Sequence, residues 1–162
     1  MSMSLENLLS LMSSPEDEHL EFKEAKSNFH FEKLVKYCVA IANEGGGTMI
    51  FGVSDKRPRR VVGSQAFTDI ERTKAGIVER LHIRVEIDAV AHPDGRVLAI
   101  QVPARPVGVP LQYQGAYWMR GGEDLVPMTA DMLKRIFEEV VPDFSAELCR
   151  EATFDDLDPD RR

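Results

Sequence analysis

An acidic cluster with a lysine beside it precedes and enters the first predicted strand, over residues 19–23: Glu16, Asp17, Glu18, Glu21 and Lys23. Alternation along this strand predicts that Leu20 and Phe22 face inward, whereas Glu21 and Lys23 face outward together. A carboxylate that binds a divalent cation, next to a lysine that stabilises negative charge on phosphorus, is typical of metal-dependent nucleases. The same spacing also suits a solvated strand edge, because a second acid-x-lysine pair follows directly at Glu24 and Lys26.

A second cluster is basic and follows the next predicted strand: Lys56, Arg57, Arg59 and Arg60. Four cations within five residues of a loop can contact the phosphates of a nucleic acid. The alternative is a solvated loop without a ligand.

Other motifs do not indicate a ligand site. The glycines at 45–47 come after a predicted helix and before a predicted strand, which is the reverse of the order in a phosphate-binding loop. They therefore predict a turn at a helix C-terminus. The four histidines and two cysteines show no zinc-ligand spacing. For a binding domain, the sequence predicts no cofactor.

The elements that must position these clusters are predicted from hydrophobic periodicity. Helical spacing of apolar residues occurs over residues 5–12, 31–43, 70–81 and 132–141. Strands are predicted over 19–23 and 48–53, and two hairpins over 85–102 and 111–120. Consecutive antiparallel hairpins do not fit a doubly wound parallel sheet. The sequence therefore predicts an α+β fold, with a mixed sheet flanked by helices.

Composition and charge predict one globular domain followed by an acidic segment. The 162 residues are 43% hydrophobic and 29% charged, which suits a globular domain with its own core. Residues 1–137 carry 17 bases and 18 acids, whereas residues 138–162 carry three bases and nine acids. We expect a domain over residues 1–141, and over 142–162 an acidic linker or the start of a truncated following region. The near-neutral body argues against a protein that coats nucleic acid through a uniformly basic surface.

The chain has no apolar run long enough to span a membrane and no basic segment of the kind that begins a signal peptide. Its two cysteines, Cys38 and Cys149, are too few for a disulfide framework. These features predict a soluble cytoplasmic protein with no membrane partner.

Four blocks of sequence together resemble the AlbA-like domain of the Schlafen family. They are EDEHLEFKEA at 16–25, VAIANEGGGTMIFGVSD at 39–55, VVG at 61–63 and YWMRG at 117–121. The blocks occur in the order of the family pattern, and the similarity extends over residues 5–140. The combination is specific, although any single block would be weak. The resemblance implies an α+β domain in which helices flank a sheet.

The resemblance also implies a function. Bacterial members are described as DNA-binding domains and transcriptional regulators, so we expect a nucleic-acid-binding (DNA-binding) domain of a bacterial transcriptional regulator. The alternative is an endoribonuclease of the Schlafen type, in which three acids bind magnesium or manganese. Carried over to this sequence, the metal ligands would be Glu16, Glu21 and Asp55, and the catalytic residues Glu16, Glu21 and Lys23. Glu16 and Glu21 lie on opposite faces of a regular strand, so they converge only if residues 15–18 leave the strand line.

Two further expectations concern partners. Schlafen cores pair two related lobes, and this chain supplies one, so the resemblance implies a homodimer. A protein–protein interaction module is the second functional alternative. The three functions predict different surfaces: a contiguous basic face for the binding domain, carboxylates clustered with Lys23 for the nuclease, and an exposed apolar patch for the interaction module.

Overall fold

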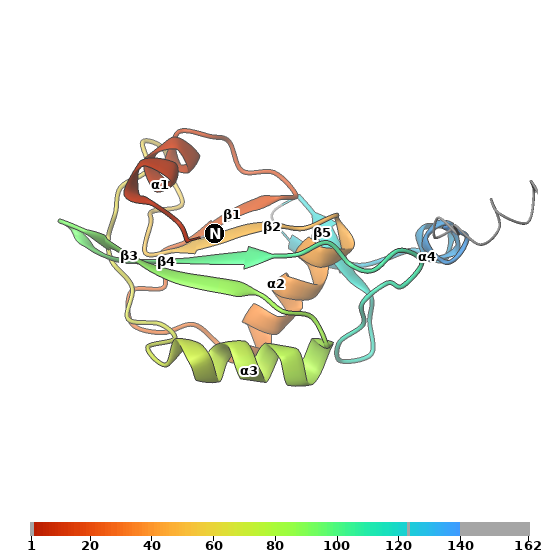
Figure 1. Cartoon of the computed structure of the whole chain (residues 1–162). Coiled ribbons are helices and arrows are strands. Elements are labelled where there is room, and N and C mark those ends of the chain that lie inside the picture. Colours follow the sequence, from red (N-terminus) through yellow and green to blue (C-terminus); the bar gives the residue numbers. More distant parts are fainter. Residues whose placement is uncertain (1, 123, 140–162) are drawn as a thin grey trace, which may run out of the picture.

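The structure, a computed structural model, describes residues 2–122 and 124–139 (Figure 1). The helices are α1 (Leu5–Met12), α2 (Phe31–Asn43), α3 (Ile70–Leu81) and α4 (Ala130–Phe137). The strands are β1 (Leu20–Lys23), β2 (Gly47–Phe51), β3 (Glu86–His92), β4 (Gly95–Val102), β5 (Trp118–Gly121) and β6 (Asp124–Pro127). Over this part of the chain, no helix has the length and apolar character needed to cross a membrane. The predicted linker at 142–162 lies outside the described residues.

The main sheet has the strand order β1-β2-β4-β3, and β5 pairs with β6 in a separate two-stranded sheet. β1 is parallel to β2, whereas β2 and β3 are both antiparallel to β4, so the sheet is mixed. α2 and α3 lie on one face of this sheet and α1 lies on the other (Figure 1). The predicted α+β fold, with a mixed sheet flanked by helices, is confirmed.

The central strand β2 is apolar over Met49, Ile50 and Phe51 because helices cover both of its faces. Met49 and Phe51 pack in the core beneath α2 and α3, whereas Ile50 between them packs in the core beneath α1. All three side chains are fully buried. α1 contributes Leu8 to its side of the core, and the Ser4 hydroxyl caps the helix by accepting the Asn7 N–H. A continuous apolar strand is what burial on both faces requires.

The glycine run ends α2, as predicted. Gly46 N–H donates to Ile41 O and Gly45 N–H donates to Ala42 O, the hydrogen-bond pattern of a Schellman motif. Both glycines have positive φ, +100° and +93° in chain order. The turn brings Gly47 against the backbone of His19, where β1 and β2 meet.

Two element predictions were wrong in detail. The second hairpin pairs β5 with β6, and residues 111–113 contribute only an isolated bridge between Tyr113 and Ala116. The reason is that the backbone of Leu111 is hydrogen-bonded to the side chain of Asn43: Leu111 N–H donates to Asn43 Oδ1, and Leu111 O accepts from Asn43 Nδ2. These backbone groups are therefore not available for pairing with another strand. The last helix begins at Ala130, two residues before the predicted start, because the Thr129 hydroxyl caps it by accepting the Met132 N–H, and it ends at Phe137.

α4 is tied to the loop that follows β4 by one carboxylate. The Arg105 guanidinium donates to both oxygens of Glu139, at 2.8 and 2.5 Å, and Gly108 N–H donates to the same carboxylate at 3.0 Å. The Arg105 and Gly108 hydrogen bonds lower the pKa of Glu139 to about 2. This contact therefore weakens only in strong acid, as the pH falls from the ordinary range of a glutamate towards 2.

Replacing Gly47 with alanine tests the close approach of β1 to β2. A Cβ at this position would lie 2.3 Å from His19 O, so the strand backbones must separate. We expect the free energy of unfolding, from urea denaturation, to fall by about 3 kcal/mol. Gly115→Ala is the control, because no atom lies within 4 Å of its Cβ and only its positive φ costs about 1 kcal/mol. Equal losses in the two variants would contradict the proposed clash.

Candidate functional site

Glu21 is buried, contrary to the prediction that it faces solvent. Its side chain points to the α2 side of the sheet, where β5 packs over α2 and supplies Arg120. Arg120 Nη2 donates to Glu21 Oε2, and Lys23 Nζ lies 2.9 Å from Glu21 Oε1. Glu21 is 4% exposed and Arg120 is 7% exposed. Alternation correctly predicted that Glu21 and Lys23 share a face, but not that other elements cover that face.

Lys23 completes this buried charge cluster. Its ammonium lies 5.0 Å from the centroid of the Tyr37 ring, and its side chain is 23% exposed. Burial lowers the pKa of Lys23, but hydrogen bonds to Glu21 and Tyr37 outweigh burial and raise the pKa above its ordinary value. Lys23 is therefore protonated throughout the physiological range, and two cations face the single Glu21 carboxylate.

Asn43 at the end of α2 positions the strand that carries Arg120. Its side-chain N–H groups donate to Trp118 O at 2.8 Å and to Leu111 O at 3.1 Å, and its Oδ1 accepts Leu111 N–H at 2.8 Å. Trp118 begins β5, two residues before Arg120. Sequence reasoning assigned no role to Asn43 or Arg120, although both lie in the blocks that carry the family resemblance.

Glu16 lies beside the other edge of this cluster and hydrogen-bonds to backbone. Residues 15–18 do leave the strand line: Asp17 forms an antiparallel bridge with Leu20, and the chain turns between them. Glu16 Oε1 then accepts Phe22 N–H at 2.9 Å, on the free edge of β1. Glu16 and Arg120 line one hollow of about 350 Å³. Of the predicted acids, Glu21 thus contacts Arg120, and Glu16 lines the same hollow as Arg120.

Asp55, the third predicted ligand, lies on the exposed loop after β2. Burial raises its pKa, Lys23 opposes this rise, and Glu24 and Glu21 add to it. Asp55 therefore lies within electrostatic range of Lys23 and Glu21. Its backbone carbonyl accepts a hydrogen bond from Arg59 Nη1 at 3.0 Å.

The contacts of these acids do not fit a divalent metal ion. Magnesium and manganese need several free oxygen ligands around one point. Both carboxylate oxygens of Glu21 are engaged by cations, and Oε1 of Glu16 is engaged by the backbone. Across residues 2–122 and 124–139, no group of three His, Cys, Asp or Glu side chains is placed to hold a metal ion. The ligand set Glu16, Glu21 and Asp55 stays a prediction from the resemblance.

The basic loop divides into exposed and anchored cations. Lys56, Arg57 and Arg60 are exposed. Arg59 is partly buried, and its guanidinium lies 4.1 Å from the centroid of the Phe22 ring. The loop is closed at its base because Ser54 N–H donates to Arg60 O and the Ser54 hydroxyl accepts Arg60 N–H. Arg59 thus holds the loop against the sheet while the other three cations reach solvent.

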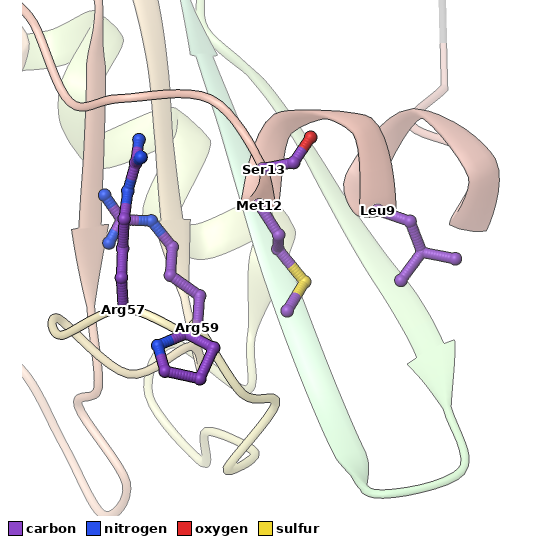
Figure 2. Close-up of a pocket in the computed structure, with 6 residues that line it drawn as sticks. Leu9, Met12, Ser13, Arg57 and Arg59 are labelled. Atoms are coloured by element: carbon purple, nitrogen blue, oxygen red, sulfur yellow. The ribbon is translucent and has the colours of Figure 1, made fainter.

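The loop and α1 enclose a shallow hollow of about 670 Å³. It is lined by Leu9, Met12 and Ser13 of α1 and by Arg57, Pro58 and Arg59 of the loop. In Figure 2, the two arginines stand on one side of the hollow, and Leu9 and Met12 project from α1 on the other. Sequence reasoning missed this hollow, because no local pattern indicates that a helix at residues 5–12 lies beside a loop at residues 56–60.

Glu21 and Arg59 therefore lie on opposite faces of β1, whereas Asp55, at the start of the loop, lies within electrostatic range of Glu21. Phe22 carries Arg59 on the α1 side, whereas Glu21 faces Arg120 on the α2 side. A ligand on the basic loop would not contact the buried Glu21 carboxylate directly.

Comparison with known proteins supports the family resemblance and the fold. The family model "Schlafen, AlbA_2" matches residues 16–129. The crystal structure of the DIP2311 protein from Corynebacterium diphtheriae is similar, with a TM-score of 0.63 and 22% identity. That match covers 84% of this chain and 32% of the other, so this chain spans about a third of the length of that relative.

A second solved structure is the N-terminal domain of a RecG-related protein from Nitrosomonas europaea, determined in solution by NMR. It matches with a TM-score of 0.47 and 21% identity, over 76% of this chain and 92% of the other. At these identities, similarity to a solved structure shows the fold alone. No curated protein matches this sequence.

Breaking the buried pair should destabilise the fold. Glu21→Gln removes the charge that balances Arg120, whereas Arg120→Met leaves Glu21 paired with Lys23. We expect the free energy of unfolding, from urea denaturation, to fall by about 3–5 kcal/mol in Glu21→Gln and by less in Arg120→Met. The double variant should be more stable than the sum of the two losses implies.

Glu138→Gln is the matched control, because Glu138 pairs with Lys134 on the surface of α4 at 3.9 Å. Its effect should stay within about 0.5 kcal/mol. Strictly additive losses in the double variant would show that Glu21 and Arg120 do not stabilise each other.

Proposed function

The chain belongs to the Schlafen AlbA_2 family, and we propose on this basis that it is a nucleic-acid-binding domain whose basic loop, residues 56–60, contacts phosphates. The observation that carries the proposal is the exposure of Lys56, Arg57 and Arg60 on one closed loop. Among the described residues, these three side chains form no ion pair within 4.0 Å, so their charges are not neutralised by close carboxylates.

Phosphate contact explains affinity but does not select a nucleic acid. We propose DNA as the ligand and the DNA-binding domain of a bacterial transcriptional regulator as the role, both from the family resemblance. A cytoplasmic location is part of the same proposal. RNA is the competing ligand, and binding measurements on both nucleic acids separate the two.

A homodimer is proposed as the functional state. The support from the structure is a set of exposed apolar side chains on α4 and on the loop that packs near its C-terminal end: Val107, Val109, Met132 and Phe137. Val109 is 51% exposed and Phe137 is 59% exposed. We propose that a second copy of the chain, and not a different protein, covers these side chains.

Replacing Arg57 and Arg60 with alanine should weaken binding evenly across nucleic-acid sequences. Each lost phosphate contact reduces the slope of log K against log salt by about 0.9 for a duplex, so two contacts reduce it by about 1.8. Fluorescence anisotropy with labelled DNA and RNA duplexes at several salt concentrations measures both quantities. Arg59 is left unchanged because it anchors the loop on Phe22.

The matched control replaces two exposed arginines, Arg72 on α3 and Arg84 in the segment between α3 and β3, which lines a hollow together with α3. α3 lies on the side of the sheet opposite α1 (Figure 1). The control removes the same charge as the loop variant but no proposed phosphate contact. It should therefore leave the slope of log K against log salt almost unchanged. If both variants lose affinity equally, the loop has no special role in binding. An unchanged affinity in the loop variant alone would place the nucleic-acid site elsewhere.

Light scattering tests the dimer. The parent chain should have the mass of a dimer at about 100 μM, because a functional dimer has a dissociation constant well below this concentration. Val109→Ser with Phe137→Ser should shift the mass towards the monomer. Val78→Ser, on the surface of α3, removes another exposed apolar side chain and should not. A monomeric parent chain at this concentration would remove the proposal.

A further inference from the structure

The hollow between α1 and the basic loop combines apolar and cationic walls. Leu9 is 49% exposed, and with Met12 it forms the apolar wall. Arg57 and Arg59 form the opposite wall (Figure 2). Nε of Arg59 is buried without a hydrogen-bond partner among the described residues. A ligand made of phosphates alone would use the arginines and leave the apolar wall exposed to water. The complementary ligand carries anionic and apolar groups close together.

The chain itself contains a segment of that composition. Residues 154–160 read FDDLDPD, in which four aspartates alternate with two large apolar residues, Phe154 and Leu157. No base occurs between residues 151 and 160. The hollow has two apolar side chains and two guanidinium groups. Its apolar wall therefore matches the apolar residues of the segment, and its cationic wall matches the aspartates.

The connection is long enough for docking within one chain. Position 154 follows position 139, the last one described, by fifteen steps along the chain, which span up to about 50 Å when extended. A domain of this length has a radius of gyration of about 15 Å. The segment can therefore reach the hollow, although α4 and α1 lie at opposite ends of the view in Figure 1.

We propose that residues 154–160 dock in the hollow lined by Leu9, Met12, Arg57 and Arg59, and that the docked segment covers the basic loop. A tethered segment has an effective concentration of about 1 mM. If the segment alone binds with a dissociation constant of about 0.1 mM, it occupies the hollow about nine-tenths of the time. Nucleic acid would then bind about tenfold more weakly than it binds the free loop. This last consequence rests on the proposed function, whereas docking itself does not.

Docking is measured on the full chain without nucleic acid. Burial raises the pKa of the Cys38 thiol to about 12, so a nitroxide reagent should modify Cys149 and leave Cys38 unmodified. Cys149 is five residues from position 154, a span of at most about 18 Å. In NMR spectra, the nitroxide should broaden the amide signals of Leu9, Met12 and Arg57 but not that of Val78 on α3. Ionic strength of about 1 M should restore the signals.

Asp155→Asn with Asp156→Asn should also restore the signals, and so should Arg57→Glu. The matched control, Glu71→Gln with Glu79→Gln on the exposed surface of α3, changes the net charge equally and should leave the broadening in place. Absence of broadening at Leu9, Met12 and Arg57 overturns the proposal, as does equal broadening at Val78. Broadening only between labelled and unlabelled chains in a mixture would assign the segment to a second copy, which also overturns it.

Nucleic-acid affinity separates this proposal from the proposed function. Asp155→Asn with Asp156→Asn should raise affinity for duplex DNA by up to about tenfold, and the α3 control should have a smaller effect. If no variant binds DNA or RNA, the proposed function fails while the NMR result still decides docking. If both tail and control variants gain affinity equally, general charge explains the gain and competition by the docked segment is wrong.

Discussion

The burial of the Glu21 carboxylate is the constraint on which the arrangement of this domain depends. Glu21 is 4% exposed, and a buried carboxylate is stable only when cations and hydrogen bonds replace its hydration. Arg120 must therefore lie over β1, which requires β5 to pack on α2, and Asn43 holds the first residue of β5 in place. Three blocks that are far apart in the sequence, around positions 21, 43 and 120, thus meet in one cluster. The combination of blocks that marks the family has a physical explanation in this cluster.

This arrangement changes how the acidic motif is interpreted. The pair of Glu21 and Lys23 has the spacing of a nuclease site, but in the described structure both groups serve the buried ion cluster. Cleavage chemistry would need Glu21 to exchange its cationic partners for a metal ion. On the other side of β1, Arg59 of the basic loop packs on Phe22, and the other three cations of the loop are exposed. The buried ion cluster and the anchor of the basic loop thus depend on two adjacent residues of one short strand, Glu21 and Phe22.

Local patterns predicted the helices well, and tertiary contacts explain the errors. The bounds of α1, α2 and α3 follow from apolar periodicity and from caps such as Ser4, which are local signals. The burial of Glu21 did not follow, because alternation shows which side chains share a face but not which element covers it. The second hairpin was misplaced because Asn43, 68 residues before Leu111, takes the backbone groups of that segment. The hollow beside α1 depends entirely on packing between distant segments, so no sequence pattern indicates it.

Glu16 has a consequence for how this domain behaves at high concentration. β1 is an edge strand of the sheet, and an edge with free N–H groups can pair with a strand of another molecule and begin aggregation. The Glu16 carboxylate accepts the outward Phe22 N–H, and the turn through Asp17 runs along the same edge. A negatively charged side chain therefore occupies the position that an incoming strand would need. The first acid of the motif acts to stop the sheet from growing, a role that requires neither a metal ion nor a substrate.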